Sequence, residues 1–148
     1  MNIQTILCPV DFSEYNLAAN KYASTLARST GGRIIYIHAF LPDPYETPPV
    51  YFDAAKTEQE LGEKREQFIK PVDSGIAVSY VVEFGLPTER IVHYANENDV
   101  DLIVVGTHGR TGLRRVLMGS VAEAVVRNAN CPVLAIKAEA SVPQETKN

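Results

Sequence analysis

Long apolar runs are missing from this chain, and its hydrophobic stretches are no longer than a single strand. A helix that crosses a membrane needs about 20 consecutive apolar residues, so no membrane span is predicted. The first residues, Met1 to Gln4, also lack the basic and apolar regions of an export signal. We therefore expect a cytoplasmic protein with no membrane partner.

Basic charge and cysteine are both scarce. The chain carries 14 Lys and Arg against 18 Asp and Glu, a net charge of −4. Binding to a phosphodiester backbone needs a basic face, so nucleic acid is not expected as a partner. The two cysteines, Cys8 and Cys131, are each followed by proline. Without an export signal they are interpreted as free thiols in a reducing compartment, with a disulfide as the alternative.

Apolar stretches of strand length alternate with stretches of helical periodicity along the chain. With 148 residues, 45% of them hydrophobic, the chain is predicted to form one domain with a substantial core. This alternation predicts a single doubly wound α/β domain, a five-stranded parallel sheet with helices on both faces. Strands are predicted at 5–10, 33–39, 76–84, 101–105 and 132–137, and helices at 13–30, 53–70, from 87 onward and at 119–130.

Helix boundaries are indicated by capping residues. Ser13 is predicted to be the N-cap of the first helix, and Gly31-Gly32 to end it. Pro87 suits the first turn of the third helix. Apolar side chains at helical spacing predict the buried face of the first helix: Ala19, Tyr22, Ala23, Leu26 and Ala27.

Two segments do not fit a strand or a helix. Four prolines fall between 41 and 52, which predicts a long loop. This loop is either a lid, with Tyr45 and Tyr51 over a bound base, or an exposed connection. Residues 139–148 are polar and without periodicity, which predicts a flexible C-terminal tail after a domain of residues 1–138.

A glycine-rich stretch, 106–120, follows the fourth predicted strand and leads into the last helix. It contains neither a P-loop signature nor the GxGxxG fingerprint of dinucleotide-binding proteins. It does contain three arginines and no carboxylate, in an otherwise acidic chain. Glycines let main-chain N–H groups approach a ligand, and a helix start adds unpaired donors and a positive dipole end. The stretch therefore indicates a bound anion, phosphate first, with a plain connecting loop as the alternative.

The spacing Gly106-x2-Gly109-x9-Gly119-Ser120 resembles the nucleotide-binding motif of the universal stress protein family. The likeness implies the strand order 3-2-1-4-5. Because the glycine motif is complete, it also implies the branch of the family that binds ATP. It spans nearly the whole chain through these stretches: Ile6 to Ser13, Gly85 to Pro87, Asp101 to Gly109, Gly119 to Ala122 and Cys131 to Leu134.

The resemblance also implies a role for individual residues. Asp11 would contact the ribose hydroxyls, with capping of the first helix as its alternative role. The main chain of Ala39 would pair with adenine beside an apolar wall formed by Pro9 and Val10. Ser120 would add a hydroxyl to the phosphate site, or act as an ordinary N-cap. The residues expected around the phosphates are Gly106, Thr107, His108, Gly109, Arg110, Gly119, Ser120 and Val121.

The function implied is that of a stress-response regulator whose state depends on bound ATP, or on ADP or AMP. Mg²⁺ or Mn²⁺ would accompany the nucleotide, and hydrolysis would be slow at most, because no catalytic residue is identified beside the glycine loop. A homodimer, or a higher oligomer, would form through the last strand, Pro132 to Ile136, since edge strands invite pairing. Two alternatives stay open: a nucleotide-free dimeric scaffold for partner proteins, and a true ATPase or nucleotidyl transferase.

Overall fold

The computed structural model describes residues 1–13, 16–41, 54–68, 75–108 and 118–137. Within these residues the strands form one parallel sheet with the order β3-β2-β1-β4-β5. The predicted fold and strand order are therefore confirmed. The elements are β1 (Thr5–Pro9), α1 (Leu17–Thr30), β2 (Arg33–Phe40), α2 (Ala54–Phe68), β3 (Val78–Phe84), α3 (Pro87–Glu97), β4 (Leu102–Gly106), α4 (Ser120–Asn128) and β5 (Val133–Ile136).

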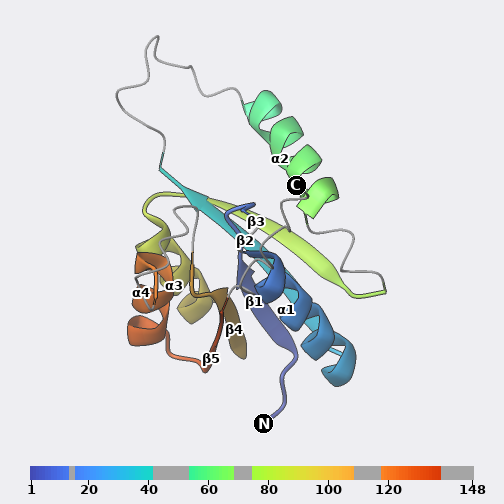
Figure 1. Cartoon of the computed structure of the whole chain (residues 1–148), viewed down its shortest axis with the longest axis vertical. Helices are drawn as coiled ribbons and strands as arrows, with labels where there is room; N and C mark the ends of the chain where they lie inside the picture. The colour runs from blue at the N-terminus through green and yellow to red at the C-terminus, as the bar shows by residue number, and fades with distance from the viewer. Residues whose placement is uncertain (14–15, 42–53, 69–74, 109–117, 138–148) are drawn as a thin grey trace, which may run out of the picture.

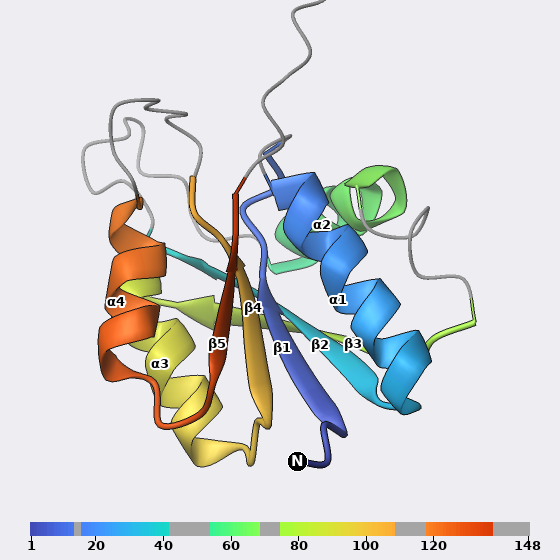
Figure 2. The ribbon, with the colours of Figure 1, turned by 60° about the horizontal axis from the view of Figure 1, so that its bottom comes forward.

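The sheet lies between two layers of helices, with α1 and α2 on one face and α3 and α4 on the other (Figures 1 and 2). Every residue of β1 is buried, as expected for the central strand of such a sheet. Its side chains alternate between the two layers: Ile6 and Cys8 pack under α1, and Leu7 packs under α3 and α4. No described helix is long and apolar enough to cross a membrane.

The start of α1 differs from the prediction. The N-cap is Asn16, not Ser13, and no side chain caps the helix. The main-chain N–H and the hydroxyl of Ser13 both donate to Oδ1 of Asp11, at 2.9 and 2.6 Å, so Ser13 belongs to the preceding turn. The end of α1 is as predicted, because Gly31 has φ 69°, the left-handed conformation that glycine adopts without steric cost.

The predicted inner face of α1 is confirmed for its alanines. Ala19, Ala23 and Ala27 are buried, and Leu26 is half-buried against the same core. Tyr22 is 52% exposed, so its assignment to this face is wrong. Strand and helix ends elsewhere lie within about two residues of their predicted positions, the usual scatter of such boundaries.

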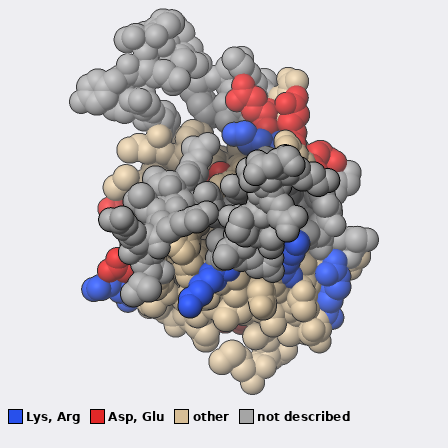
Figure 3. Space-filling view, in the orientation of Figure 1, with Lys and Arg blue, Asp and Glu red and all other residues tan. Residues whose placement is uncertain are grey.

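The second helix has a solvated outer face, as its charged sequence indicates. Leu61 is buried, and acidic side chains gather over α2 beside basic ones (Figure 3). On its inner side, Lys64 lies 5.7 Å from the ring centroid of Phe12, and Arg65 lies 4.8 Å from that of Tyr80. Residues 42–52 of the predicted lid or loop, and the tail predicted at 139–148, lie outside the described residues.

Both cysteines are free thiols, which confirms the prediction. Cys8 is fully buried, and its Sγ lies 3.5 Å from Oδ1 of Asn20. Cys131 is half-buried, and burial raises the pKa of its thiol, with the negative charge of Asp101 raising it further. The thiolate is the reactive form of cysteine, so a raised pKa makes Cys131 less reactive at neutral pH.

Candidate functional site

A cavity of about 300 Å³ opens at the carboxyl ends of β1 and β4. This is the point where the strand order reverses, because β1 lies between β2 and β4. Ligands of open α/β sheets bind at such reversals, and the volume lies at the lower end of the range for small-molecule pockets. The cavity is lined by Pro9, Val10, Asp11, Asn16, His38, Ala39, Pro87, Ile91, Val105, Gly106, Thr107, His108, Gly119, Ser120, Val121 and Ala122.

Proline explains why the sheet opens between β1 and β4. The two strands are in register only at Ile6↔Leu102 and Leu7↔Ile103. Thr5 accepts a hydrogen bond from Asp101 on the β4 side, so residues 5, 7 and 9 direct their main-chain groups toward β4. Pro9 has no N–H to donate, and the ladder ends there.

The turn after β1 is held by two polar side chains. Asn16, which is 6% exposed, accepts from the N–H of Asp11 at 2.9 Å and donates to the carbonyl of Pro9 at 3.2 Å. Asp11 accepts from Ser13 through Oδ1, as in an Asx turn. Between them Phe12 has φ 60°, which is uncommon for an aromatic residue. These bonds fix the Asp11 carboxylate at the rim of the cavity.

The main chain of Ala39 faces the cavity. On β2, the N–H of Ile34 and the carbonyl of Phe40 pair with the β3 side, so even-numbered residues face β3. Ala39 therefore directs its N–H and C=O toward β1, but the register with β1 ends at Pro9↔Ile37. Among the described residues neither group has a hydrogen-bond partner on that side. A donor and an acceptor thus stand side by side at the cavity wall.

The opposite wall is the start of α4. Its N-cap is Gly119, and no side chain caps the helix. The first N–H groups of a helix have no acceptor within it, so Ser120 and Val121 offer donors to the cavity. The N–H of Gly119 donates to the carbonyl of Thr107 at 2.6 Å, which ties together the two ends of the segment 108–118.

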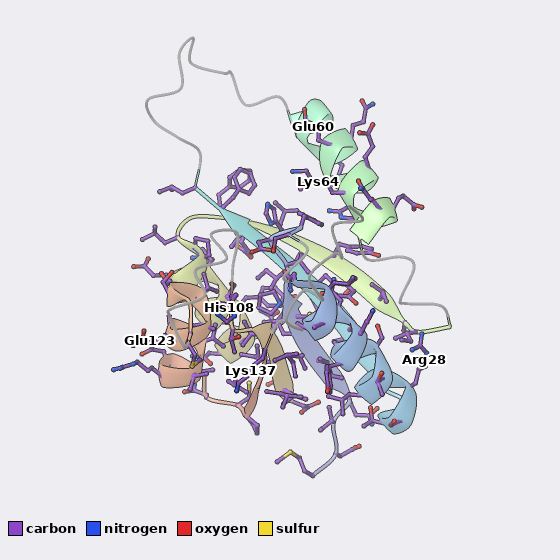
Figure 4. All side chains as sticks on the ribbon, viewed as in Figure 1. Arg28, Glu60, Lys64, His108, Glu123 and Lys137 are labelled. Atoms are coloured by element: carbon purple, nitrogen blue, oxygen red, sulfur yellow. The ribbon has the colours of Figure 1, made fainter. Side chains whose placement is uncertain are left out.

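Thr107 and His108 form a second polar group at the end of β4. Thr107 is 5% exposed, and its N–H donates to the carbonyl of Ile136. Its hydroxyl lies 3.0 Å from Nδ1 of His108. His108 lies within the outline of the molecule near α3 and α4, whereas Glu123 stands at the outer edge on α4 (Figure 4). The His108 ring is therefore held by a buried hydroxyl beside the helix start.

The structure brings most of the predicted site residues together. All of them line the cavity except Gly109 and Arg110, which lie outside the described residues. The alternative reading of Ser120 as an N-cap is wrong, because Ser120 is the first residue of α4. Met118 packs against the core under α3 and α4.

Sequence reasoning missed Asn16 and the apolar wall formed by Pro87 and Ile91. Pro87 begins α3 as predicted, and Ile91 is 3% exposed on its inner face. Their spacing indicated a helix, but only the tertiary structure shows that this helix also borders the cavity. Within the described residues Asp11 is the one carboxylate of the lining, and no group of three or more His, Cys, Asp or Glu is placed to hold a metal ion.

Comparison with known proteins identifies the family. The sequence matches the model of the universal stress protein family over residues 2–137. The chain belongs to the universal stress protein family. Universal stress protein MJ0531 of Methanocaldococcus jannaschii is 34% identical, and the match covers 89% of this chain and 81% of that protein.

Solved universal stress proteins share this fold. The structure of MJ0577 from the same archaeon is 30% identical and covers 95% of this chain and all of that one, with a TM-score of 0.75. A universal stress protein solved in complex with cAMP is 24% identical over 94% of this chain and 100% of its own, with a TM-score of 0.70. At that identity the second likeness shows the fold alone.

Proposed function

We propose that this universal stress protein belongs to the ATP-binding branch of the family and acts as a regulatory module whose state depends on the bound nucleotide. One observation carries the proposal: a single cavity joins an open peptide edge, a carboxylate and an uncapped helix start, at Ala39, Asp11 and Gly119. These three features suit the base, the ribose and the phosphates of one nucleotide. A solved member with this fold holds cAMP, which is a property of that protein.

The base would lie against Ala39. Adenine presents an acceptor ring nitrogen beside a donor amino group, and the N–H and C=O of Ala39 complement that pattern. Guanine has a carbonyl oxygen in place of the amino group, and this oxygen would face the Ala39 carbonyl. The apolar side chains of Val10, Pro87 and Ile91 would cover the faces of the ring. The site therefore favours adenine over guanine.

The phosphates would lie at the start of α4. The N–H groups there are orphan donors at the positive end of the helix dipole. Thr107 and His108 add polar side chains at the same end of the cavity. The predicted contacts from Gly109 and Arg110 are part of this proposal.

The oxygen ligands and bases that line the cavity determine how a metal ion would be held and whether hydrolysis is expected. Mg²⁺ in nucleotide sites is usually held by the phosphates, water and one or two carboxylates. The cavity offers the single carboxylate of Asp11, which also accepts from Ser13. Mg²⁺ or Mn²⁺ would thus enter with the nucleotide, held mainly by its phosphates. Because Asp11 is proposed to bind ribose, no described side chain is assigned as a general base, and at most slow hydrolysis is proposed.

The ribose contact is tested with Asp11→Asn, which keeps one oxygen for Ser13 and replaces the other with a donor. By calorimetry in Mg²⁺, we expect wild-type protein to bind ATP about tenfold more tightly than 2′-deoxy-ATP, the worth of one hydrogen bond to a charged group. The variant should bind both equally, at the weaker affinity. Mass spectrometry of ligand released on heating the purified protein gives an independent reading. No adenine nucleotide in that sample and no binding at millimolar ATP would overturn the proposed function.

A homodimer through β5 is the second part of the proposal. The carbonyls of Pro132 and Ile136 face β4, so residues 133 and 135 direct their main-chain groups to the open edge. Ala135 is exposed there, beside the half-buried Val133 and Leu134. A second copy of β5 would satisfy this edge, as paired edge strands do.

The edge contact is tested with Ala135→Pro, which removes an outward N–H without touching the ladder to β4. In sedimentation equilibrium we expect the wild type at twice the 16.3 kDa of one chain, and the variant at the monomer mass. Ala135→Ser retains the N–H and should stay dimeric. A monomeric wild type, or a proline variant that still forms the dimer, would contradict the β5 contact.

A further inference from the structure

His38 holds the first carbonyl of the turn after β1, that of Val10. Its Nδ1 lies 2.9 Å from the carbonyl oxygen of Val10. A carbonyl oxygen only accepts, so Nδ1 must carry the hydrogen, and the neutral ring is the Nδ1–H tautomer. The ring is packed between Phe12 and Phe40, with centroids 5.0 and 5.5 Å away. The donor is therefore held toward Val10 by its neighbours.

This bond takes the place of a bond in the sheet. The N–H of Val10 donates to the carbonyl of Ile37 at 2.9 Å. In a parallel ladder the next bond would run from the N–H of Ala39 to the carbonyl of Val10. That bond is not formed, and the Val10 carbonyl accepts from the His38 side chain instead. Pairing of β1 with β2 accordingly stops at Pro9↔Ile37.

We propose that His38 is a positioning residue that keeps the N–H of Ala39 available for a ligand. By holding the Val10 carbonyl toward its own ring, His38 keeps that carbonyl out of line with the N–H of Ala39, so the two strands do not pair for one more residue and close the base end of the cavity. The inference rests on the proposed function only for the identity of the ligand. Whether the N–H of Ala39 bonds to the Val10 carbonyl does not depend on any ligand and can be measured in the protein alone.

The test compares two substitutions of nearly equal shape. His38→Asn keeps a side-chain N–H near the place of Nδ1, whereas His38→Leu removes the donor. In the leucine variant we expect Ala39 to pair with Val10, giving a scalar coupling through the hydrogen bond between the Ala39 nitrogen and the Val10 carbonyl carbon. The wild type and His38→Asn should lack this coupling. Affinity for adenosine should fall about tenfold in His38→Leu alone, and the preference for ATP over GTP should fall with it.

Two results would overturn the inference. One is a leucine variant that binds adenosine as the wild type does. The other is nitrogen NMR of the wild-type imidazole showing the proton on Nε2, a measurement that does not depend on any variant folding. If the wild type binds no adenine nucleotide, the proposed function fails. The Ala39–Val10 coupling then decides by itself whether His38 keeps the strands apart.

Discussion

Gly119→Val is expected to weaken ATP binding about 100-fold. Gly119 lines the cavity and directly precedes the N–H groups at the start of α4. A branched side chain there would keep the phosphates from two of these donors. Hydrogen bonds to charged groups contribute about 1.5–3 kcal/mol each, and each 1.4 kcal/mol is tenfold in affinity. Calorimetry with ATP in Mg²⁺ measures the loss directly.

The control for this variant is Gly119→Ser. The backbone of Gly119 has φ −68° and ψ 166°, which any residue adopts, so neither substitution requires a strained backbone at this position. Serine is small and a favourable N-cap, so we expect it to retain most of the affinity. Adenosine, which lacks phosphates, should bind all three proteins within a few-fold. Equal losses for adenosine and ATP would show that valine perturbs the cavity as a whole, and would contradict a loss specific to phosphate contacts at α4.

Leu7→Ala is expected to lower the free energy of unfolding by about 2–5 kcal/mol. Leu7 is fully buried in the central strand, where it joins the core beneath α3 and α4. Its removal leaves a cavity between the sheet and two helices, and close-packed interiors relax only partly around such a loss. Urea denaturation followed by circular dichroism measures the change.

The matched control is Leu41→Ala, the same chemical deletion at a side chain that is 59% exposed. There we expect a change below about 1 kcal/mol, because little apolar surface returns to water. Similar losses at both positions would contradict the central place of β1 in the core. The slope of the denaturation curve should be the same for wild type and both variants, as expected when only stability changes.

The sequence predicted most of the architecture because its periodic signals agree with the tertiary contacts. The run from Thr5 to Pro9 is apolar after its first residue, and the strand it forms is buried on both faces. The helical spacing of the alanines in α1 likewise predicted its buried face, because these alanines pack against the sheet. Tyr22 fits the same helical spacing, yet it is exposed, since spacing alone does not fix the width of a buried stripe.

The site was less predictable where its chemistry belongs to the main chain. Ser13 and Asn16 are both good N-cap residues, and the sequence does not show that Asp11 engages the first of them. The open edge at Ala39 depends on which residues of β2 face β1, and on where that pairing stops. Such information exists only once the strands are in register. The family resemblance predicted a role for the main chain of Ala39. The hydrogen bonds of Val10 to Ile37 and His38 explain why that main chain is left without a partner on β1.

The cavity owes much of its polar character to peptide groups, at Ala39, Gly119 and the first turn of α4. The positions of these peptide groups depend on the backbone conformation, and only indirectly on which side chains surround them. Apolar residues around the cavity can be exchanged for others of similar size while these peptide groups stay in place. Conversely, a single bulky replacement at Gly119 is expected to weaken ligand binding strongly and leave the scaffold intact. We therefore expect few mutational steps to separate a fold of this kind that binds a ligand from one that does not.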